Sequence, residues 1–178
     1  ENYCKKIIEA GANIFYIAIF STKERVHDYI TRTKGSCKQS LGGIKNLLKF
    51  IENVYINIVI MKDNFKYLFD TIDALLNLGI KHINLSMVRP EGKTEDKYND
   101  FAPRLSELRI QLNKIVSERK FKCLNTTFNR IPLCLMNKYG EIDKLPFKVL
   151  PDIDKFDGFE TNLKLYNVYR RANRLLVK

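Results

Sequence analysis

Cysteines are few in this chain and widely separated, which limits the metal and redox sites that it could form. The 178 residues include four of them, at positions 4, 37, 123 and 134. No two have the Cys-x-x-Cys spacing of a zinc ribbon or a redox pair, so the thiols do not make a metal site by themselves. No export signal is visible. We therefore expect reduced, mostly buried thiols in a protein of the cytoplasm.

Long apolar runs and phosphate-binding loops are also missing. No hydrophobic stretch approaches the ~18 residues that a membrane-spanning helix requires, so we expect no membrane partner. Gly42-Gly43 is not followed by Lys-Ser or Lys-Thr, which argues against a phosphate loop. The sequence also shows neither a nucleophile elbow nor a cluster of carboxylates. Simple sequence signatures of hydrolases and nucleotide-binding proteins are therefore excluded.

What the sequence does contain is an alternation of amphipathic helices and apolar strands. Gly11 and Gly79 each end a predicted helix directly before a strand. Strands are predicted over 14–20, 55–61, 82–88 and 121–128. Helices are predicted over 2–10, 37–51, 65–78, 103–119 and 161–176. This alternation predicts an α/β fold with a parallel sheet covered by helices, and the continuous apolar run at 14–20 predicts a strand buried on both faces.

The order of these segments indicates that the chain begins partway through a repeated pattern. It opens on a helix that feeds a parallel strand, so the strand that should precede this helix is expected to lie upstream of Glu1. We interpret residues 1–140 as part of a larger α/β enzyme and residues 141–178 as a wrapping segment that ends in a helix. Without its neighbours, the first strand would expose an edge that favours aggregation.

Polar residues gather where the predicted strands end, which is where parallel sheets and barrels bind their ligands. These strand-end positions are Ser21, Thr22, Lys62, Asp63, Asn64, Arg89, Glu91, Asn125 and Thr126. Asn57 and Ser86 lie within strands and are expected to face the interior. The set suits a polar ligand with hydroxyls or a carboxylate better than hydrolysis by paired acids. Ordinary strand-end caps remain an equal alternative. Asn57 is the strongest candidate, because a buried amide without partners costs about 1–3 kcal/mol.

His27 and Asp28 could form a general-base pair in the polar segment 21–40. Together with Glu24 they fall at helical spacing. Adjacent residues on a helix do not face each other, however, so their side chains are not expected to act as a pair. A structural role for both is the preferred interpretation.

The order of several short motifs resembles the central region of radical S-adenosylmethionine (radical SAM) enzymes. The first part is GANIFYIAIFSTKERVHDYITRTKGSCKQSLGGIKNLL, in which a strand ending in serine precedes a His-Asp pair, a T-x-x-x-G-S turn and a GI-x-NL helix. The second is YINIVIMKDNFKYLFDTIDALLNLGIKHINLSMVRPEG, with an embedded Asn, an LGI helix end and a closing RP-x-G. The IPLC at 131–134 is similar to the family's P-x-C. The resemblance covers roughly residues 1–140.

This resemblance implies a fragment of a partial (βα)6 barrel of the TIM type, with 14–20, 55–61 and 82–88 as its fourth, fifth and sixth strands. In the family, a Cys-x-x-x-Cys-x-x-Cys motif binds a 4Fe–4S cluster that cleaves S-adenosylmethionine to a radical. That motif is not in these residues. The resemblance implies that Ser21, Asn57 and Arg89 contact S-adenosylmethionine, and that the substrate is a peptide or a small molecule. The chain alone is expected to hold no cluster and to be inactive.

The formal net charge of +11 raises a different function, the binding of nucleic acid. A basic, non-catalytic α/β module would show exposed aromatic rings beside its basic residues. Most of the aromatics fall in strands predicted to be buried, including Phe15, Tyr16, Phe20 and Tyr55. The sequence clusters its basic residues only near the end, at Arg170, Arg171, Arg174 and Lys178. Nucleic acid is therefore not the expected partner. An enzyme with a different barrel or with a doubly wound fold also remains an alternative.

Overall fold

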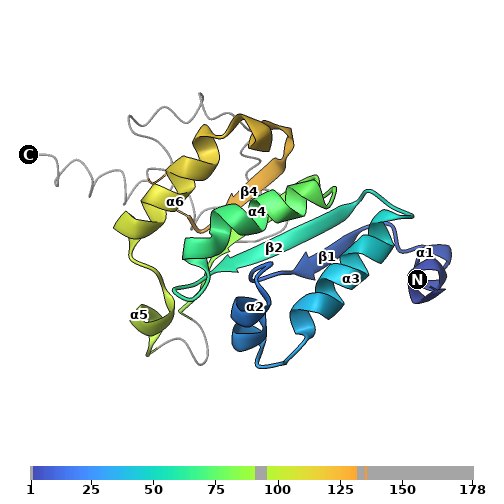
Figure 1. The fold of residues 1–178 in the computed structure, drawn as a ribbon, viewed down its shortest axis with the longest axis horizontal. Coiled ribbons are helices and arrows are strands. Elements are labelled where there is room, and N and C mark those ends of the chain that lie inside the picture. The colour runs from blue at the N-terminus through green and yellow to red at the C-terminus, as the bar shows by residue number, and fades with distance from the viewer. Residues whose placement is uncertain (1, 91–95, 132–134, 136–178) are drawn as a thin grey trace, which may run out of the picture.

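A computed structural model describes residues 2–90, 96–131 and 135 of the chain. Helices and strands alternate along it, as the sequence predicts (Figure 1). The four strands are β1 Phe15–Ala18, β2 Val54–Ile60, β3 His82–Met87 and β4 Asn125–Asn129. The α-helices are α1 Asn2–Glu9, α2 Glu24–Thr31, α3 Ser36–Leu48, α4 Leu68–Asn77, α5 Tyr98–Phe101 and α6 Leu105–Ser117. The described residues also include the 3-10 helices η1 Phe65–Tyr67 and η3 Arg119–Cys123.

The sheet has four parallel strands in the order β1-β2-β3-β4, which confirms the predicted parallel α/β fold. The order follows the chain and does not reverse within the described strands, unlike that of a doubly wound sheet. The pairing places Asn57 opposite Asn84 and Asn84 opposite Thr127. Because parallel strands keep this register along their length, each row across the sheet presents side chains to one common face.

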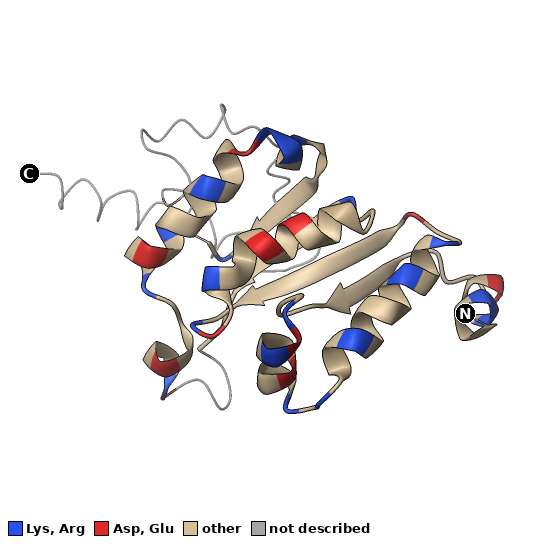
Figure 2. Ribbon diagram, viewed as in Figure 1, with Lys and Arg blue, Asp and Glu red and all other residues tan. Residues whose placement is uncertain are grey.

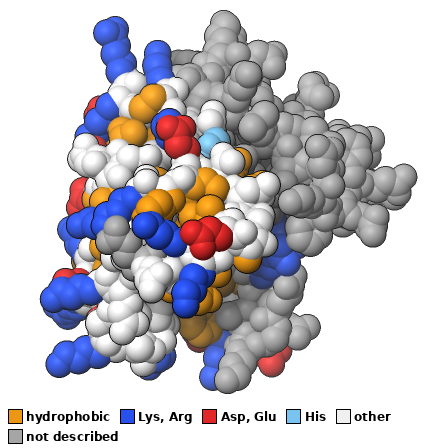
Figure 3. Space-filling model, turned by 90° about the vertical axis from the view of Figure 1, so that its right-hand side faces the viewer, with side chains coloured by type: hydrophobic (Ala, Val, Ile, Leu, Met, Phe, Trp, Pro, Cys, Tyr) orange, Lys and Arg blue, Asp and Glu red, His pale blue; other side chains and the backbone are white. Residues whose placement is uncertain are grey.

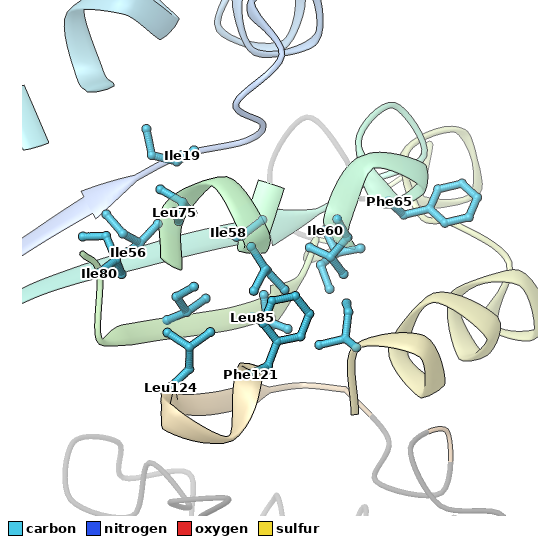
Figure 4. Packing of buried hydrophobic residues seen from close by; sticks show 14 of the residues in the cluster. Ile19, Ile56, Ile58, Ile60, Phe65, Leu75, Ile80, Leu85, Phe121 and Leu124 are labelled. Atoms are coloured by element: carbon cyan, nitrogen blue, oxygen red, sulfur yellow. The ribbon is translucent and has the colours of Figure 1, made fainter. Parts of the chain in front are cut away.

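Helices α3, α4 and α6 cover one face of the sheet (Figure 1). On β2 every second residue points into this layer and is fully buried, and these residues are Val54, Ile56, Ile58 and Ile60. Figure 4 shows Ile56, Ile58 and Ile60 in one cluster with side chains of the helices and of η3, and Val54 belongs to the same cluster. The cluster joins Leu75 of α4 to Phe121 of η3 and Leu85 of β3. None of the helices within the described ranges is long and apolar enough to cross a bilayer.

Two predicted strands differ from those observed. The strand predicted at 14–20 is β1, and it is not buried on both faces, because Tyr16 is 66% exposed. Phe15 and Ile17 pack against the core, whereas Tyr16 points to the opposite face, away from the helix layer. The strand predicted at 121–128 begins only at Asn125, because the apolar residues before it form the 3-10 helix η3.

The helix boundaries differ by smaller amounts. The helix predicted at 65–78 starts as a 3-10 turn before α4, and the one predicted at 103–119 is α6. The helical spacing of His27 and Asp28 is confirmed by α2. The predicted wrapping segment and the helix at 161–176 lie outside the described residues, as does the basic cluster near the end of the sequence.

Candidate functional site

The face of the sheet opposite the helices carries a hydrogen-bonded band of polar side chains. Asn84 Nδ2 donates to Asn57 Oδ1 at 2.7 Å, and Thr127 Oγ1 donates to Asn84 Oδ1 at 2.8 Å. Ser86 Oγ donates to the same oxygen of Asn57 at 3.3 Å. All four side chains are half-buried. The band thus runs across β2, β3 and β4, and the bonds to Asn57 use its carbonyl oxygen, leaving its amide nitrogen out of the network.

A row of rings crosses the same face nearer the start of the strands. Tyr16 stacks on Tyr55 with 5.0 Å between ring centroids, and Tyr55 stacks on His82 at 4.3 Å. His82 Nδ1 lies 3.4 Å from Asn125 Nδ2 on the next strand. Burial lowers the pKa of His82 below its ordinary value, and the positive charge of Lys81 adds to this effect. His82 is therefore a neutral ring at physiological pH.

The alternation of residues in each strand explains why these groups meet. In β3, His82, Asn84 and Ser86 alternate with Ile83, Leu85 and Met87, and the apolar members face the helices. In β2, Tyr55, Asn57 and Val59 alternate with buried apolar residues, and in β4 Asn125, Thr127 and Asn129 alternate with Thr126 and Phe128. No Asp, Glu, Lys or Arg occurs in any of the four strands. The face offers amides, hydroxyls and neutral rings, which suits hydrogen bonding to a polar ligand rather than proton transfer by paired acids.

Asn57 is the predicted site residue that the structure places on this face. It is hydrogen bonded to Ser86, the other residue predicted to lie within a strand and to face the interior. Sequence reasoning missed Asn84 and Thr127, which complete the band. The signal that could have found Asn84 is the alternation of polar and apolar residues in HINLSM, and that for Thr127 is the run of polar residues in NTTFN, each combined with parallel register.

Ser21 lies elsewhere, among the helices. It is fully buried, and its Oγ is 3.3 Å from Thr71 Oγ1 of α4 and accepts from the backbone N of Lys23 at 3.1 Å. Its carbonyl oxygen is 3.6 Å from Sγ of Cys37. The structure therefore does not bring Ser21 and Asn57 together. The contact between Ser21 and a cofactor stays a prediction, and the internal hydrogen bonds of its hydroxyl do not favour it.

The other strand-end residues have varied surroundings. Arg89 lies two residues after the end of β3 and is half-buried. Lys62 Nζ donates to the carbonyl oxygen of Asn99 at 2.5 Å. Asn125 and Thr126 were placed at a strand end by the sequence, and this is wrong, because β4 begins at Asn125 and they lie at the opposite end of the strand. Glu91 is outside the described residues.

His27 and Asp28 do not act as a pair, and each has its own structural partners. Nδ1 of the buried His27 accepts from the backbone N of Phe20 at 3.3 Å. Burial lowers the pKa of His27, although the charge of Asp28 opposes this. Asp28 caps the start of α3, where its carboxylate accepts from the backbone N of Cys37 at 2.9 Å, that of Gly35 at 2.5 Å and Ser36 Oγ at 3.0 Å.

The cap by Asp28 predicts a pH dependence of stability. The hydrogen bonds from Cys37 and Gly35 lower the pKa of Asp28 below its ordinary value, so the folded state favours the ionised carboxylate. This stabilisation is complete above the unfolded-state pKa and is lost as the pH falls through the folded-state pKa. We expect Asp28→Asn to unfold at lower urea concentration than wild type near neutral pH, with a gap that narrows towards about pH 3. A gap that stays constant over this range would contradict the cap.

Cysteine positions do not suggest a metal centre. Cys4 and Cys37 are buried, Cys123 is exposed, and all three are free thiols. Across residues 2–90, 96–131 and 135, no group of three His, Cys, Asp or Glu side chains could hold a metal ion. Cys134, the cysteine of the IPLC motif, is outside these ranges.

The polar band and the ring row therefore form the candidate site, on a face built by β1 to β4 and opposite the helices. Comparison of the chain with protein-family models and with curated proteins finds no match.

Proposed function

We propose that the chain belongs to a radical SAM enzyme, in which its sheet forms part of the wall of a partial barrel around S-adenosylmethionine and a peptide or small-molecule substrate. The observation that carries the proposal is the polar band of Asn57, Asn84 and Thr127 on the face opposite the helices. In a (βα) barrel the helices lie outside, and the opposite face of each strand lines the interior. A polar interior band is what a ligand rich in hydroxyl, amino and carboxylate groups requires.

The topology supports the same proposal. Sequential parallel strands with α3, α4 and α6 on one side are the local arrangement of a barrel wall, because right-handed crossovers that advance in one direction stay on one face. A doubly wound sheet would reverse its strand order and place helices on both faces. In the described sheet β1 pairs only with β2, so its other edge can receive the earlier strands that a barrel needs.

The residues suit the two parts of the cofactor system differently. Amide and hydroxyl groups on the polar face suit hydrogen bonds to the ribose and methionyl groups of S-adenosylmethionine, with Asn57 as the central contact and Arg89 at the end of β3 as a carboxylate partner. An iron–sulfur cluster of this type needs several thiolates close together. Cys4, Cys37 and Cys123 lie on three separate elements and do not fit that need. In this proposal the described residues form part of the wall of the site and supply no ligand of the cluster.

The test uses the complete open reading frame that encodes these residues. The protein is purified anaerobically and reconstituted with iron and sulfide. Its cluster is followed by electron paramagnetic resonance, and 5′-deoxyadenosine is measured after addition of a reductant. We expect a cluster signal and cleavage of S-adenosylmethionine. The absence of both signals from a folded, iron-loaded preparation would overturn the proposal.

Equilibrium dialysis with labelled S-adenosylmethionine tests the role of Asn57 separately. Asn57→Ala should weaken binding by about tenfold, the effect expected when one hydrogen bond to a ligand is lost. Asn77→Ala, which removes an exposed amide of α4, is the matched control and should leave binding unchanged. Equal affinities of the two variants for S-adenosylmethionine would show that Asn57 does not contact the cofactor. Melting temperatures of both variants show whether they are folded.

A further inference from the structure

Basic residues concentrate on α2, on α3 and on the turn between them. Residues 22–49 contain seven Lys or Arg and two acidic residues. Along α3 there are two lysines and no acid, whereas α4 beside it has two aspartates and no base (Figure 2). In Figure 3, which views the molecule from the α1 side, Lys and Arg side chains project along the left-hand margin, where the helix layer lies. Positive charge is therefore concentrated on α2, α3 and the turn between them.

Both acidic residues of this region are already engaged. The carboxylate of Asp28 is used by the start of α3, and Glu24 lies 3.5 Å from Lys38. Four of the seven basic side chains in this region are exposed and form no ion pair within the described part of the chain. We define them as the α2–α3 basic surface, which consists of Arg25, Arg32, Lys34 and Lys45.

An exposed aromatic ring lies within this surface. Arg25, Tyr29 and Arg32 are four and three residues apart, a spacing that puts them on one side of α2. Tyr29 is 56% exposed, and the guanidinium of Arg32 is 5.2 Å from the centre of its ring. Arg32 occupies the left-handed position after α2, which ends that helix and brings the chain to Lys34. This combination of an exposed ring and guanidinium groups beside lysines is typical of a surface that binds nucleic acid.

We propose that the α2–α3 basic surface binds a single-stranded nucleic acid, with its cations on the phosphates and Tyr29 stacked on a base. Lys and Arg neutralise phosphates and release counterions, and aromatic rings accept any base by stacking. A lipid surface would call for an apolar helix face beside the charges, but the apolar residues Ile44 and Leu47 of α3 are buried in the core. An acidic protein would not need the exposed ring beside Arg32. The surface lies on the helix side of the sheet, so this proposal does not depend on the proposed enzyme function.

The test measures the binding of a fluorescent 12-nucleotide oligouridylate by anisotropy at several salt concentrations. The variant Arg25→Gln/Lys34→Gln/Lys45→Gln removes three cations of the surface. The matched control, Lys97→Gln/Arg109→Gln/Lys122→Gln, removes three exposed cations from other elements. We expect the first variant to bind at least tenfold more weakly, with the slope of log K against log salt reduced by about 2, since each phosphate contact contributes ~0.7 on a single strand. The control should bind within about twofold of wild type.

The stacking role of Tyr29 is tested separately. Tyr29→Ala should weaken binding about tenfold without changing the salt slope, because stacking does not release counterions. Circular dichroism shows whether each variant retains the wild-type helix content. The proposal fails if wild type does not bind at low salt, or if both triple variants lose affinity equally. It also fails if a polyglutamate peptide of the same charge displaces the RNA as well as unlabelled oligouridylate does, since that result would identify an acidic protein as the partner.

Discussion

Replacing Asn64 with alanine is expected to lower the free energy of unfolding by about 3 kcal/mol, because its side chain satisfies three backbone groups at once. Its Oδ1 accepts from the backbone N of Met61 at 2.8 Å, and its Nδ2 donates to the carbonyl oxygens of Phe20 at 2.9 Å and Val59 at 2.8 Å. The side chain is buried, so water does not readily replace it. In a chain of this length the melting temperature should fall by roughly 6–12 °C.

The neighbouring residue supplies the control for this prediction. Asp63 is exposed in the same turn, and Asp63→Ala should change stability by no more than about 0.5 kcal/mol. Asn64→Asp keeps one acceptor but turns an ionisable oxygen towards two carbonyl oxygens, which raises the pKa of the new carboxyl in the folded state. That variant should therefore gain stability as the pH falls, because the protonated group can donate again. Equal melting temperatures for Asn64→Ala and Asp63→Ala would contradict the role of Asn64.

The order and type of the main elements could be predicted because local signals agree with the fold. Gly11 and Gly79 both take positive φ where a helix ends before a strand, as their positions in the sequence indicate. The apolar runs at 55–61 and 82–88 correspond closely to β2 and β3, the two central strands. Each of these strands pairs with a neighbouring strand on both sides, so local preference and packing favour the same structure.

Predictions at the ends of the sheet were poorer because a run of apolar residues does not show which faces are covered. The residues of β1 are as apolar as those of a central strand, yet β1 has one neighbour in the described sheet and exposes Tyr16 on the face without helices. The segment at 121–124 is short enough to be a strand or a 3-10 turn by its periodicity alone. Only the packing of Phe121 in the core, where its ring contacts Phe69 of α4, distinguishes them.

The polar character of the candidate site could be predicted from the sequence, but most of the residues that form it could not. A polar residue within an apolar strand indicates Asn57, but its partners Asn84 and Thr127 come from strands 27 and 70 positions later. They meet through the register of two strand pairs, which no local pattern encodes. Ser21 shows the converse problem. Its position after a strand indicates a ligand contact, yet the turn that follows directs its hydroxyl towards Thr71 of α4.

The two proposals concern opposite sides of one sheet, and this separation makes them independent experimentally. Substitutions in the polar band change the face away from the helices, whereas Arg25, Lys34 and Lys45 lie on α2, α3 and their connection. Loss of nucleic-acid binding with unchanged binding of S-adenosylmethionine would support a surface for a partner beside a site for a cofactor. The two sets of variants therefore serve as controls for each other.

Replacing Phe121 with alanine should also destabilise the protein strongly, by about 3–5 kcal/mol, because it removes a large fully buried ring. The ring meets Phe69 edge to face at 5.3 Å between centroids and packs in the cluster shown in Figure 4. Lys120 beside it pairs with Asp73 of α4 at 2.5 Å, so η3 is held against α4 by polar and apolar contacts together. Urea unfolding followed by circular dichroism measures the change.

Ile110 provides the matched control for Phe121. It is an exposed apolar residue of α6, and Ile110→Ala removes a large side chain without opening a cavity. We expect Ile110→Ala to change stability by no more than about 0.5 kcal/mol, and Phe121→Leu to fall between the two alanine variants because it leaves a smaller cavity. The ranking depends on η3 being part of the core rather than the start of an edge strand. A Phe121→Ala protein as stable as Ile110→Ala would show that the packing of this 3-10 helix against α4 does not contribute to stability.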